Sequence, residues 1–210
     1  MGYFFTFFYL FIVYFVLTIS KRLLNISGDI TRKIMHVFSC MSVFLINYFY
    51  IGQVHMFIIP ILYIMINWLI IRFNLFSIMQ RDAKHYGGIY FSITLFISQL
   101  FVYFKPDLLI PSYYSLLVLA FGDGASGLFG SVIVKNFRLT KYKSLVGMIS
   151  FILFSFISLL IADSYFLNIG FINLLVLAIT GSVVELLTDN GLDNFTVYFL
   201  SLFIVVLMIV

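Results

Sequence analysis

Charged residues are scarce in this chain: Asp, Glu, Lys and Arg make up 10% of its 210 residues, whereas hydrophobic residues make up 63%. So few charges exclude a soluble domain of this length and indicate an integral membrane protein. Cysteine is also nearly absent. Because Cys40 is the only one, an intramolecular disulfide and a thiolate metal cluster are both excluded.

The N-terminal run over residues 1–20 lacks a basic region and a small-residue cleavage site, so we expect a first membrane span there and no signal peptide. Apolar stretches long enough to cross a bilayer recur along the whole chain. We therefore predict an all-α fold, a single polytopic membrane helix bundle over residues 1–210 with about eight transmembrane helices. The expected spans are 3–19, 34–50, 54–71, 88–104, 109–121, 145–161, 169–187 and 194–210.

The fifth expected span is short and runs into a glycine segment, which suggests a broken helix. If this span or the last one does not cross the membrane, seven transmembrane helices remain. Eleven of the twelve Lys and Arg residues fall on one side of the alternating spans, and Lys105 alone falls on the other. The positive-inside rule makes the rich side cytoplasmic and both termini non-cytoplasmic. All acidic residues except Asp107 and Asp163 share that side, and these two lie in short, featureless turns. Any chemistry is expected at the cytoplasmic face.

The stretch FGDGASGLFG, residues 121–130, places Asp123 among four glycines. Gly122, Gly124 and Gly127 match a dinucleotide-binding spacing, but that fingerprint needs a strand before it and an acid some twenty residues after it. Glycines at such spacing also let membrane helices pack closely. A carboxylate at a membrane boundary is costly unless it is solvated, paired or metal-bound. The stretch therefore predicts either helix packing or a site where a phosphate approaches the backbone.

A basic segment without any acid follows this stretch. Its four cations are Lys135, Arg138, Lys141 and Lys143. The positive-inside signal or attraction to anionic headgroups explains such a loop, but its proximity to Asp123 favours phosphate binding. Ser144 opens the next apolar run and is a natural N-cap, and helix N-termini bind phosphate readily.

A second cluster opens the second span. In a helix that starts near Asp29, the side chains of Arg32, Lys33 and His36 project from one face of the first two turns. Flanking anchors and a core histidine would explain this arrangement. A titratable group inside a span is also a candidate functional residue, so both readings stay open.

A third cluster is acidic and lies near the last span. Glu185 and Asp189 are four residues apart on one expected helical face, and Gly191 allows a turn that brings Asp193 and Asn194 back toward them. Solvated loop acids explain Asp189 and Asp193, but Glu185 lies inside an apolar run. Three carboxylates without a local cation suit Mg²⁺, which prefers oxygen ligands and commonly binds together with substrate phosphates.

Taken in order, these segments resemble the CTP-dependent lipid alcohol kinases, the family that contains dolichol kinase and phytol kinase and is related to the phosphatidate cytidylyltransferases. The motifs that carry the resemblance are Arg32-Lys33-x-x-His36, Gly122-Asp123-Gly124-Ala125-x-x-x-x-Gly130, Lys143-Ser144-x-x-Gly147, and Glu185 followed by Asp193-Asn194. Family members often carry a proline shortly after the last motif, whereas Phe195 and Thr196 follow here. The short chain is more similar to the phytol kinase or prokaryotic polyprenol kinase type than to eukaryotic dolichol kinases.

The resemblance implies transfer of a phosphoryl group from CTP to a dolichol, polyprenol or phytol type of alcohol, giving the lipid monophosphate and CDP. Mg²⁺ would be held by Asp123 with Glu185, or by Glu185 with Asp189 or Asp193. The alcohol's proton acceptor would be Asp123 first and His36 second. The implied nucleotide-binding residues are Arg32, Lys33, Gly122, Gly124, Gly127, Lys141, Lys143, Ser144, Gly147 and Asn194.

Two other activities fit the same motifs: a phosphatidate-type cytidylyltransferase and a CTP-dependent diacylglycerol kinase. A small transporter is less favoured, because transport sites usually lie near the bilayer midplane between repeated halves, and no repeat is visible here. The expected partners are CTP, the lipid alcohol and the lipids of the membrane. No nucleic-acid partner is expected, and a homodimer remains open.

Overall fold

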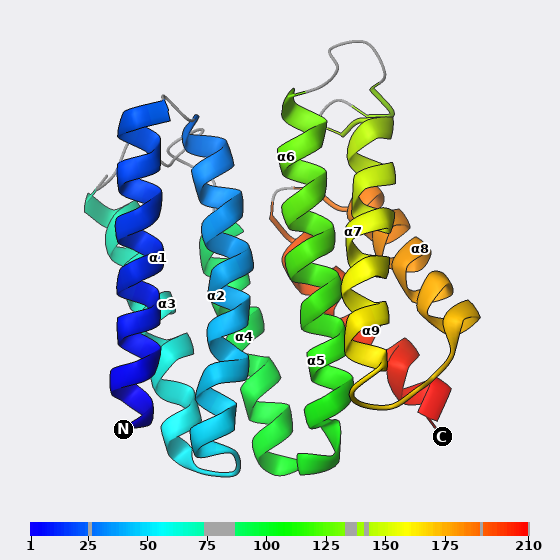
Figure 1. Ribbon diagram of the computed structural model, residues 1–210, viewed down its shortest axis with the longest axis horizontal. Coiled ribbons are helices and arrows are strands. Elements are labelled where there is room, and N and C mark those ends of the chain that lie inside the picture. Colours follow the sequence, from blue (N-terminus) through cyan, green and yellow to red (C-terminus); the bar gives the residue numbers. More distant parts are fainter. Residues whose placement is uncertain (25–26, 74–86, 133–137, 141–142, 190, 210) are drawn as a thin grey trace. The chain divides into compact units, whose positions relative to one another are not determined.

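The computed structural model describes residues 1–210 except 25–26, 74–86, 133–137, 141–142, 190 and 210 (Figure 1). The described part is mainly helical and has no strand, only an isolated bridge between Arg138 and Ser144. The prediction of an all-α fold is confirmed. Two compact units divide the chain, Met1–Pro106 and Asp107–Val210, and each is described by itself. The single bundle expected over 1–210 stays a prediction.

The first unit contains α1 (Gly2–Leu24), α2 (Gly28–Tyr50), the 3₁₀ turn η1 (Val54–Phe57), α3 (Ile58–Phe73) and α4 (Gly87–Phe104). Ser27 caps α2 by accepting a hydrogen bond from the Ile30 N–H at 3.4 Å. A Cβ on Gly2 would lie 2.6 Å from the Tyr50 ring, so the start of α1 packs tightly against the end of α2. The two helices are therefore antiparallel neighbours.

Side-chain hydrogen bonds join the helices of the first unit. The amide of Gln99 in α4 donates to Asn47 in α2 at 2.7 Å, and Asn67 in α3 donates to Ser92 in α4 at 2.9 Å. Small and amide side chains give membrane helices specific contacts that apolar surfaces alone do not supply, because lipid tails are as apolar as leucine.

The second unit is built around one nearly continuous helical segment. It comprises η2 (Pro106–Leu108), α5 (Leu109–Leu117), the π-helical segment η3 (Val118–Asp123) and α6 (Gly124–Val132). Helices α7 (Leu145–Asp163), α8 (Phe171–Leu187) and α9 (Asp193–Ile209) pack around it (Figure 1). In the span Pro106–Gly130, 78% of the apolar window is buried, which makes this segment the core of the unit.

The suggestion that the fifth span breaks at the glycines is wrong. The helix continues through Gly122 and Gly124 to Val132 and accommodates a π-turn at Val118–Asp123. Such a turn adds a residue to the helical repeat and changes the direction of the side chains that follow. A continuous helix satisfies the backbone N–H and C=O groups within the segment itself, which is the favoured arrangement inside a membrane.

Small residues allow the close packing of this core. A Cβ on Gly122 would lie 2.6 Å from the Phe151 ring of α7, and one on Gly181 would lie 2.8 Å from Val118. Gly130 of α6 faces Gly147 of α7, and a Cβ on Gly130 would lie only 3.2 Å from the Gly147 Cα. The packing interpretation of the glycines therefore holds for Gly122 and for the Gly130–Gly147 contact.

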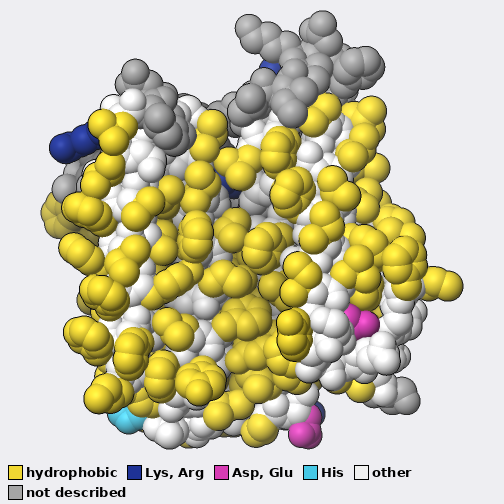
Figure 2. Space-filling view, in the orientation of Figure 1, with side chains coloured by type: hydrophobic (Ala, Val, Ile, Leu, Met, Phe, Trp, Pro, Cys, Tyr) yellow, Lys and Arg dark blue, Asp and Glu magenta, His cyan; other side chains and the backbone are white. Residues whose placement is uncertain are grey.

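Within the described part of the chain, five helical stretches are long and apolar enough to cross a membrane, and α8 and α9 are shorter apolar helices. With α2, which carries charges in its first turns, helices occupy all eight predicted spans. In Figure 2 hydrophobic side chains cover most of the visible surface of the described residues. These features indicate a membrane protein.

Candidate functional site: a lysine among three carboxylates

Asp123 is the last residue of the π-helical segment and is buried, with 3% of its surface exposed. The helix resumes immediately as α6, and one turn later the hydroxyl of Ser126 donates back to the Asp123 carbonyl at 3.4 Å. Rigid helix on both sides therefore fixes the position of the Asp123 carboxylate.

Lys143 directly precedes the N-cap of α7 and is held by hydrogen bonds with Leu139 and Thr140. The N–H groups of Leu139 and Thr140 donate to the Lys143 carbonyl at 2.9 and 3.1 Å, and the Lys143 N–H donates to the Thr140 hydroxyl at 3.1 Å. Ser144 then caps α7 by accepting from the Gly147 N–H at 3.1 Å. The prediction that Ser144 is an N-cap is confirmed, and the cap holds Lys143 at a defined point beside α6.

Glu185 and Asp193 come from the facing ends of α8 and α9. Glu185 is buried in the last turn of α8, and Gly191 has a φ of +86°, a left-handed conformation that favours glycine. The turn starts α9 at Asp193, and the Asn194 amide donates to the Gly191 carbonyl at 3.1 Å. The predicted turn at Gly191 is confirmed, and it returns Asp193 toward Glu185.

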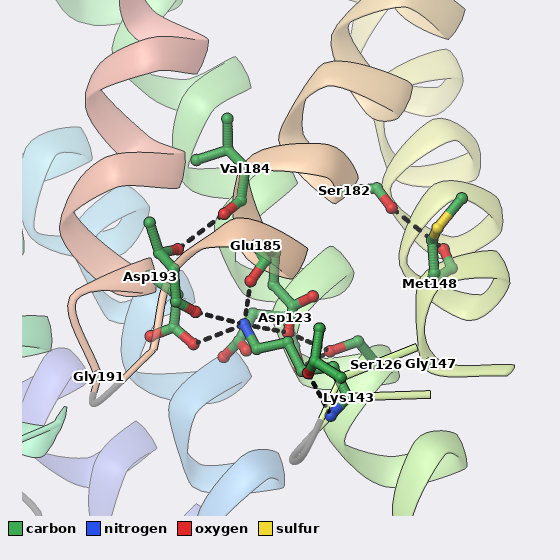
Figure 3. Close-up of polar contacts among 12 residues, drawn as sticks. Asp123, Ser126, Lys143, Gly147, Met148, Ser182, Val184, Glu185, Gly191 and Asp193 are labelled. Atoms are coloured by element: carbon green, nitrogen blue, oxygen red, sulfur yellow. Dashed lines mark hydrogen bonds and ion pairs between the residues drawn. The ribbon is translucent and has the colours of Figure 1, made fainter. Parts of the chain in front are cut away.

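The Lys143 ammonium lies among these groups (Figure 3). Its Nζ is 3.1 Å from Glu185 Oε1 and 3.4 Å from Asp193 Oδ2. It also donates to the Thr188 carbonyl at 2.7 Å and to the carbonyl of Glu185. An ammonium has three donors, so Lys143 is fully engaged, and it satisfies carbonyls at the C-terminal, negative end of α8.

The carboxylates of Asp123, Glu185 and Asp193 can each offer an oxygen so that all three oxygens lie within 4.8 Å of one another. The Ser126 hydroxyl donates to Glu185 Oε1 at 3.3 Å. When all groups are ionised, three carboxylates face one ammonium, which leaves two negative charges in excess. We call these four residues, Asp123, Lys143, Glu185 and Asp193, the acidic cluster. Its excess charge and oxygen ligands suit a hard divalent cation.

The structure also determines which of the open metal pairings can form. Asp189 is exposed and stands outside the group of three carboxylates. The expected helical face shared by Glu185 and Asp189 is wrong, because α8 ends at Leu187 and Thr188 is already extended. Asp123 and Asp193 are instead the acids that accompany Glu185.

The other predicted nucleotide-binding residues of the second unit are distributed differently. Gly124 and Gly127 lie in the first turn of α6, next to the acidic cluster in sequence. Gly147 packs against α6, and a Cβ there would lie 3.1 Å from the Ser126 carbonyl, so close helix contact accounts for this glycine. Lys141 lies outside the described residues.

Arg32, Lys33 and His36 lie in the first two to three turns of α2, in the first unit. Arg32 is exposed, and the His36 ring packs 4.1 Å from the Phe91 ring of α4, measured between centroids. A ring contact of this kind is expected of a core histidine. A joint role with the acidic cluster stays a prediction.

Two features of the second unit were missed at the level of sequence. Ser126 hydrogen-bonds Glu185, and the signal was its position three residues after Asp123 on a helix. Asp163 is buried and not in a featureless turn: it accepts from the Tyr114 hydroxyl at 2.7 Å and from the N–H groups of Ile169 and Gly170 at 2.9 and 3.4 Å.

In comparisons with protein-family models, curated proteins and solved structures, nothing matches this chain.

Proposed function

We propose that this protein is a CTP-dependent lipid alcohol kinase of the membrane, which acts on a dolichol, polyprenol or phytol type of substrate. The observation that carries the proposal is the acidic cluster: residues from three separate motifs of the family pattern, Asp123, Lys143 and Glu185, meet with Asp193 in one partly buried group. The resemblance supplies the nucleotide and the acceptor, and the cluster supplies the charge that this chemistry needs.

A divalent cation fits the residues of the cluster. Asp123, Glu185 and Asp193 would hold it, because they offer three oxygens within 4.8 Å of one another and their formal charge exceeds that of Lys143. When bound, such a cation neutralises phosphate charge and acts as a Lewis acid toward the transferred group. Mg²⁺ is the ion that this class of chemistry uses with nucleoside triphosphates.

In the proposed reaction, the alcohol oxygen bonds to the γ-phosphorus of CTP and the bond from that phosphorus to the β–γ bridging oxygen breaks. CDP leaves with that oxygen, and the hydroxyl proton passes to a carboxylate. Asp123 is the proposed acceptor, because it sits on rigid helix inside the cluster. Lys143 positions Glu185 and Asp193 through its contacts at 3.1 and 3.4 Å and limits their mutual repulsion.

We further propose that the acidic cluster faces the cytoplasm, where CTP is available, and that both termini face the opposite side. The support is the uneven distribution of cations between the predicted loops, with Lys105 alone on the far side. The acidic cluster lies at the same end of α7 as the basic segment before Ser144, so the charge rule applies to it directly.

The test uses purified protein in detergent with phytol or a polyprenol and CTP labelled at either the α or the γ phosphate. A kinase transfers γ label into lipid, and Glu185→Gln should lose this transfer while remaining folded. Transfer of α label into lipid with release of pyrophosphate would instead establish the cytidylyltransferase reaction. Transfer to diacylglycerol but to no polyprenol would identify the protein as a diacylglycerol kinase. Solute flux in proteoliposomes without CTP turnover would contradict the proposal that the protein is an enzyme.

A further inference from the structure

An open apolar groove of about 530 Å³ runs between α8 and α9 in the second unit. Its volume lies within the roughly 300–1,000 Å³ of typical small-molecule sites. The last two turns of α8 and the first turns of α9 form its walls. The lining residues are Val184, Leu187, Thr188, Phe195, Thr196, Phe199, Leu200 and Phe203.

Two threonines stand at one end of the groove, and their hydroxyls are engaged with each other and with carbonyls of Val184 and Leu192. The hydroxyls of Thr188 and Thr196 lie 3.2 Å apart, and the other lining side chains are apolar. Phe203 is seven residues beyond Thr196 on α9, so the apolar part extends roughly 10 Å along the helix. The surface of the groove is apolar, which matches a hydrocarbon chain.

The end of the groove that carries Thr188 and Thr196 lies next to the acidic cluster. Val184 directly precedes Glu185, and the carbonyl of Thr188 accepts a hydrogen bond from Lys143 at 2.7 Å. Asp193 begins α9, and Thr196 follows it by three residues, on the same side of the helix. The threonine end of the groove and the acidic cluster are therefore neighbours at the end of α8 and the start of α9.

Resting on the proposed function, we infer that this groove holds the hydrocarbon chain of the lipid alcohol, with the hydroxyl at the threonine end beside Glu185 and Asp193. Surrounding lipid is as apolar as the groove, so the chain gains packing contacts and little hydrophobic free energy. The benefit is orientation, because a positioned hydroxyl reacts far faster than a diffusing one. The groove is open, so longer chains can continue into the bilayer beyond Phe203.

The first test fills the groove without touching the cluster. Leu200→Trp should lower kcat/KM for a long-chain alcohol such as geranylgeraniol by about tenfold or more, because displacement of the reacting group by an ångström costs up to ~100-fold. Prenol, whose chain ends near the threonines, should lose much less. A matched control is Ile12→Trp, which fills a second apolar groove on α1 and α2 of about 390 Å³ and should leave both substrates unaffected.

A second test detects the chain without turnover. A diazirine-bearing long-chain isoprenoid alcohol is irradiated with the wild-type protein, and mass spectrometry maps the adducts. We expect adducts on Phe199, Leu200 or Phe203, competed by geranylgeraniol but not by the same concentration of phosphatidylcholine. Equal labelling of both grooves, or equal competition by phosphatidylcholine, would overturn the inference even when γ label is transferred. Specific labelling of the groove without any phosphoryl transfer would support the lipid site and contradict the kinase.

Discussion

Two buried acidic sites lie at opposite ends of α7, a helix of 19 residues that is about 28 Å long. At its C-terminal end, a single carboxylate, Asp163, accepts hydrogen bonds from one tyrosine hydroxyl and two backbone N–H groups. At its N-terminal end, Asp123, Glu185 and Asp193 lie close together, and the ammonium of Lys143 contacts Glu185 and Asp193. The first site accepts hydrogen bonds from neutral donors, whereas the second places three carboxylates beside one ammonium of the described residues.

The difference shows that burial of an acid in a membrane protein does not by itself mark a functional site. Asp163 ties the loop after α7 to Tyr114 of α5, which is a structural task completed by neutral donors. The acidic cluster gathers more negative charge than its cation balances, and like charges at such distances repel unless a further cation joins them. Charge balance therefore separates the two sites.

The largest expected effect is a loss of phosphoryl transfer when the acidic cluster, but not the Asp163 site, is changed. Asp123→Asn removes the proposed proton acceptor and one metal ligand, so γ-phosphoryl transfer should fall by roughly 10²–10⁴-fold. Folding should persist, because the substitution also removes one of three like charges. The measurement is kcat with labelled CTP, alongside a thermal melt. The matched control Asp107→Asn changes an exposed acid and should keep full activity; equal activity of the two variants would exclude Asp123 from the reaction.

The next effect concerns stability. Lys143→Met removes the ammonium that contacts two carboxylates and two carbonyls, and breaking a buried charged group of this kind costs about 3–5 kcal/mol. Added Mg²⁺ should restore more stability to this variant than to the wild type, because the excess charge is then larger. Unfolding in a denaturing detergent, with and without Mg²⁺, measures the loss of stability and its recovery. The exposed Lys105→Met should change stability by less than about 0.5 kcal/mol, and an equally stable Lys143→Met would contradict the described contacts.

The smallest effect tests the structural site. Asp163→Asn should destabilise the protein by about 1–2 kcal/mol, because an amide accepts more weakly than a carboxylate and can turn a donor toward the Ile169 and Gly170 N–H groups. Phosphoryl transfer by the folded fraction and its dependence on Mg²⁺ should stay unchanged. A changed Mg²⁺ requirement in this variant would remove the distinction between the two sites.

Much of the fold is predictable because membrane helices are specified by local composition. Each of the eight expected spans coincides with a helix, although the fifth helical segment extends to Val132, well beyond its expected end at 121. Ser144 and Gly191 perform the capping and turning roles that their residue types favour. The continuous fifth helix was not predicted, because glycines disfavour helix in isolation, whereas here Gly122 packs closely against Phe151 inside a buried segment.

The site was predictable in part. The residue types and their order indicated that Asp123, Lys143 and Glu185 belong together, and the structure brings them into contact with Asp193. The sequence did not reveal that Lys143 lies inside the acid group, since this depends on the end of α8 and the turn before α7. The role of Asp163 was also hidden, because its partner Tyr114 is 49 residues away.

Binding of Mn²⁺ to the purified protein, followed by electron paramagnetic resonance with Mg²⁺ as competitor, tests the cluster most directly. Wild type and Asp163→Asn should bind Mn²⁺ alike, and Glu185→Gln should weaken binding by roughly 10–100-fold or more. If wild type binds no Mn²⁺ that Mg²⁺ displaces, or if Glu185→Gln binds it as tightly, the carboxylates of Asp123, Glu185 and Asp193 do not form a divalent cation site.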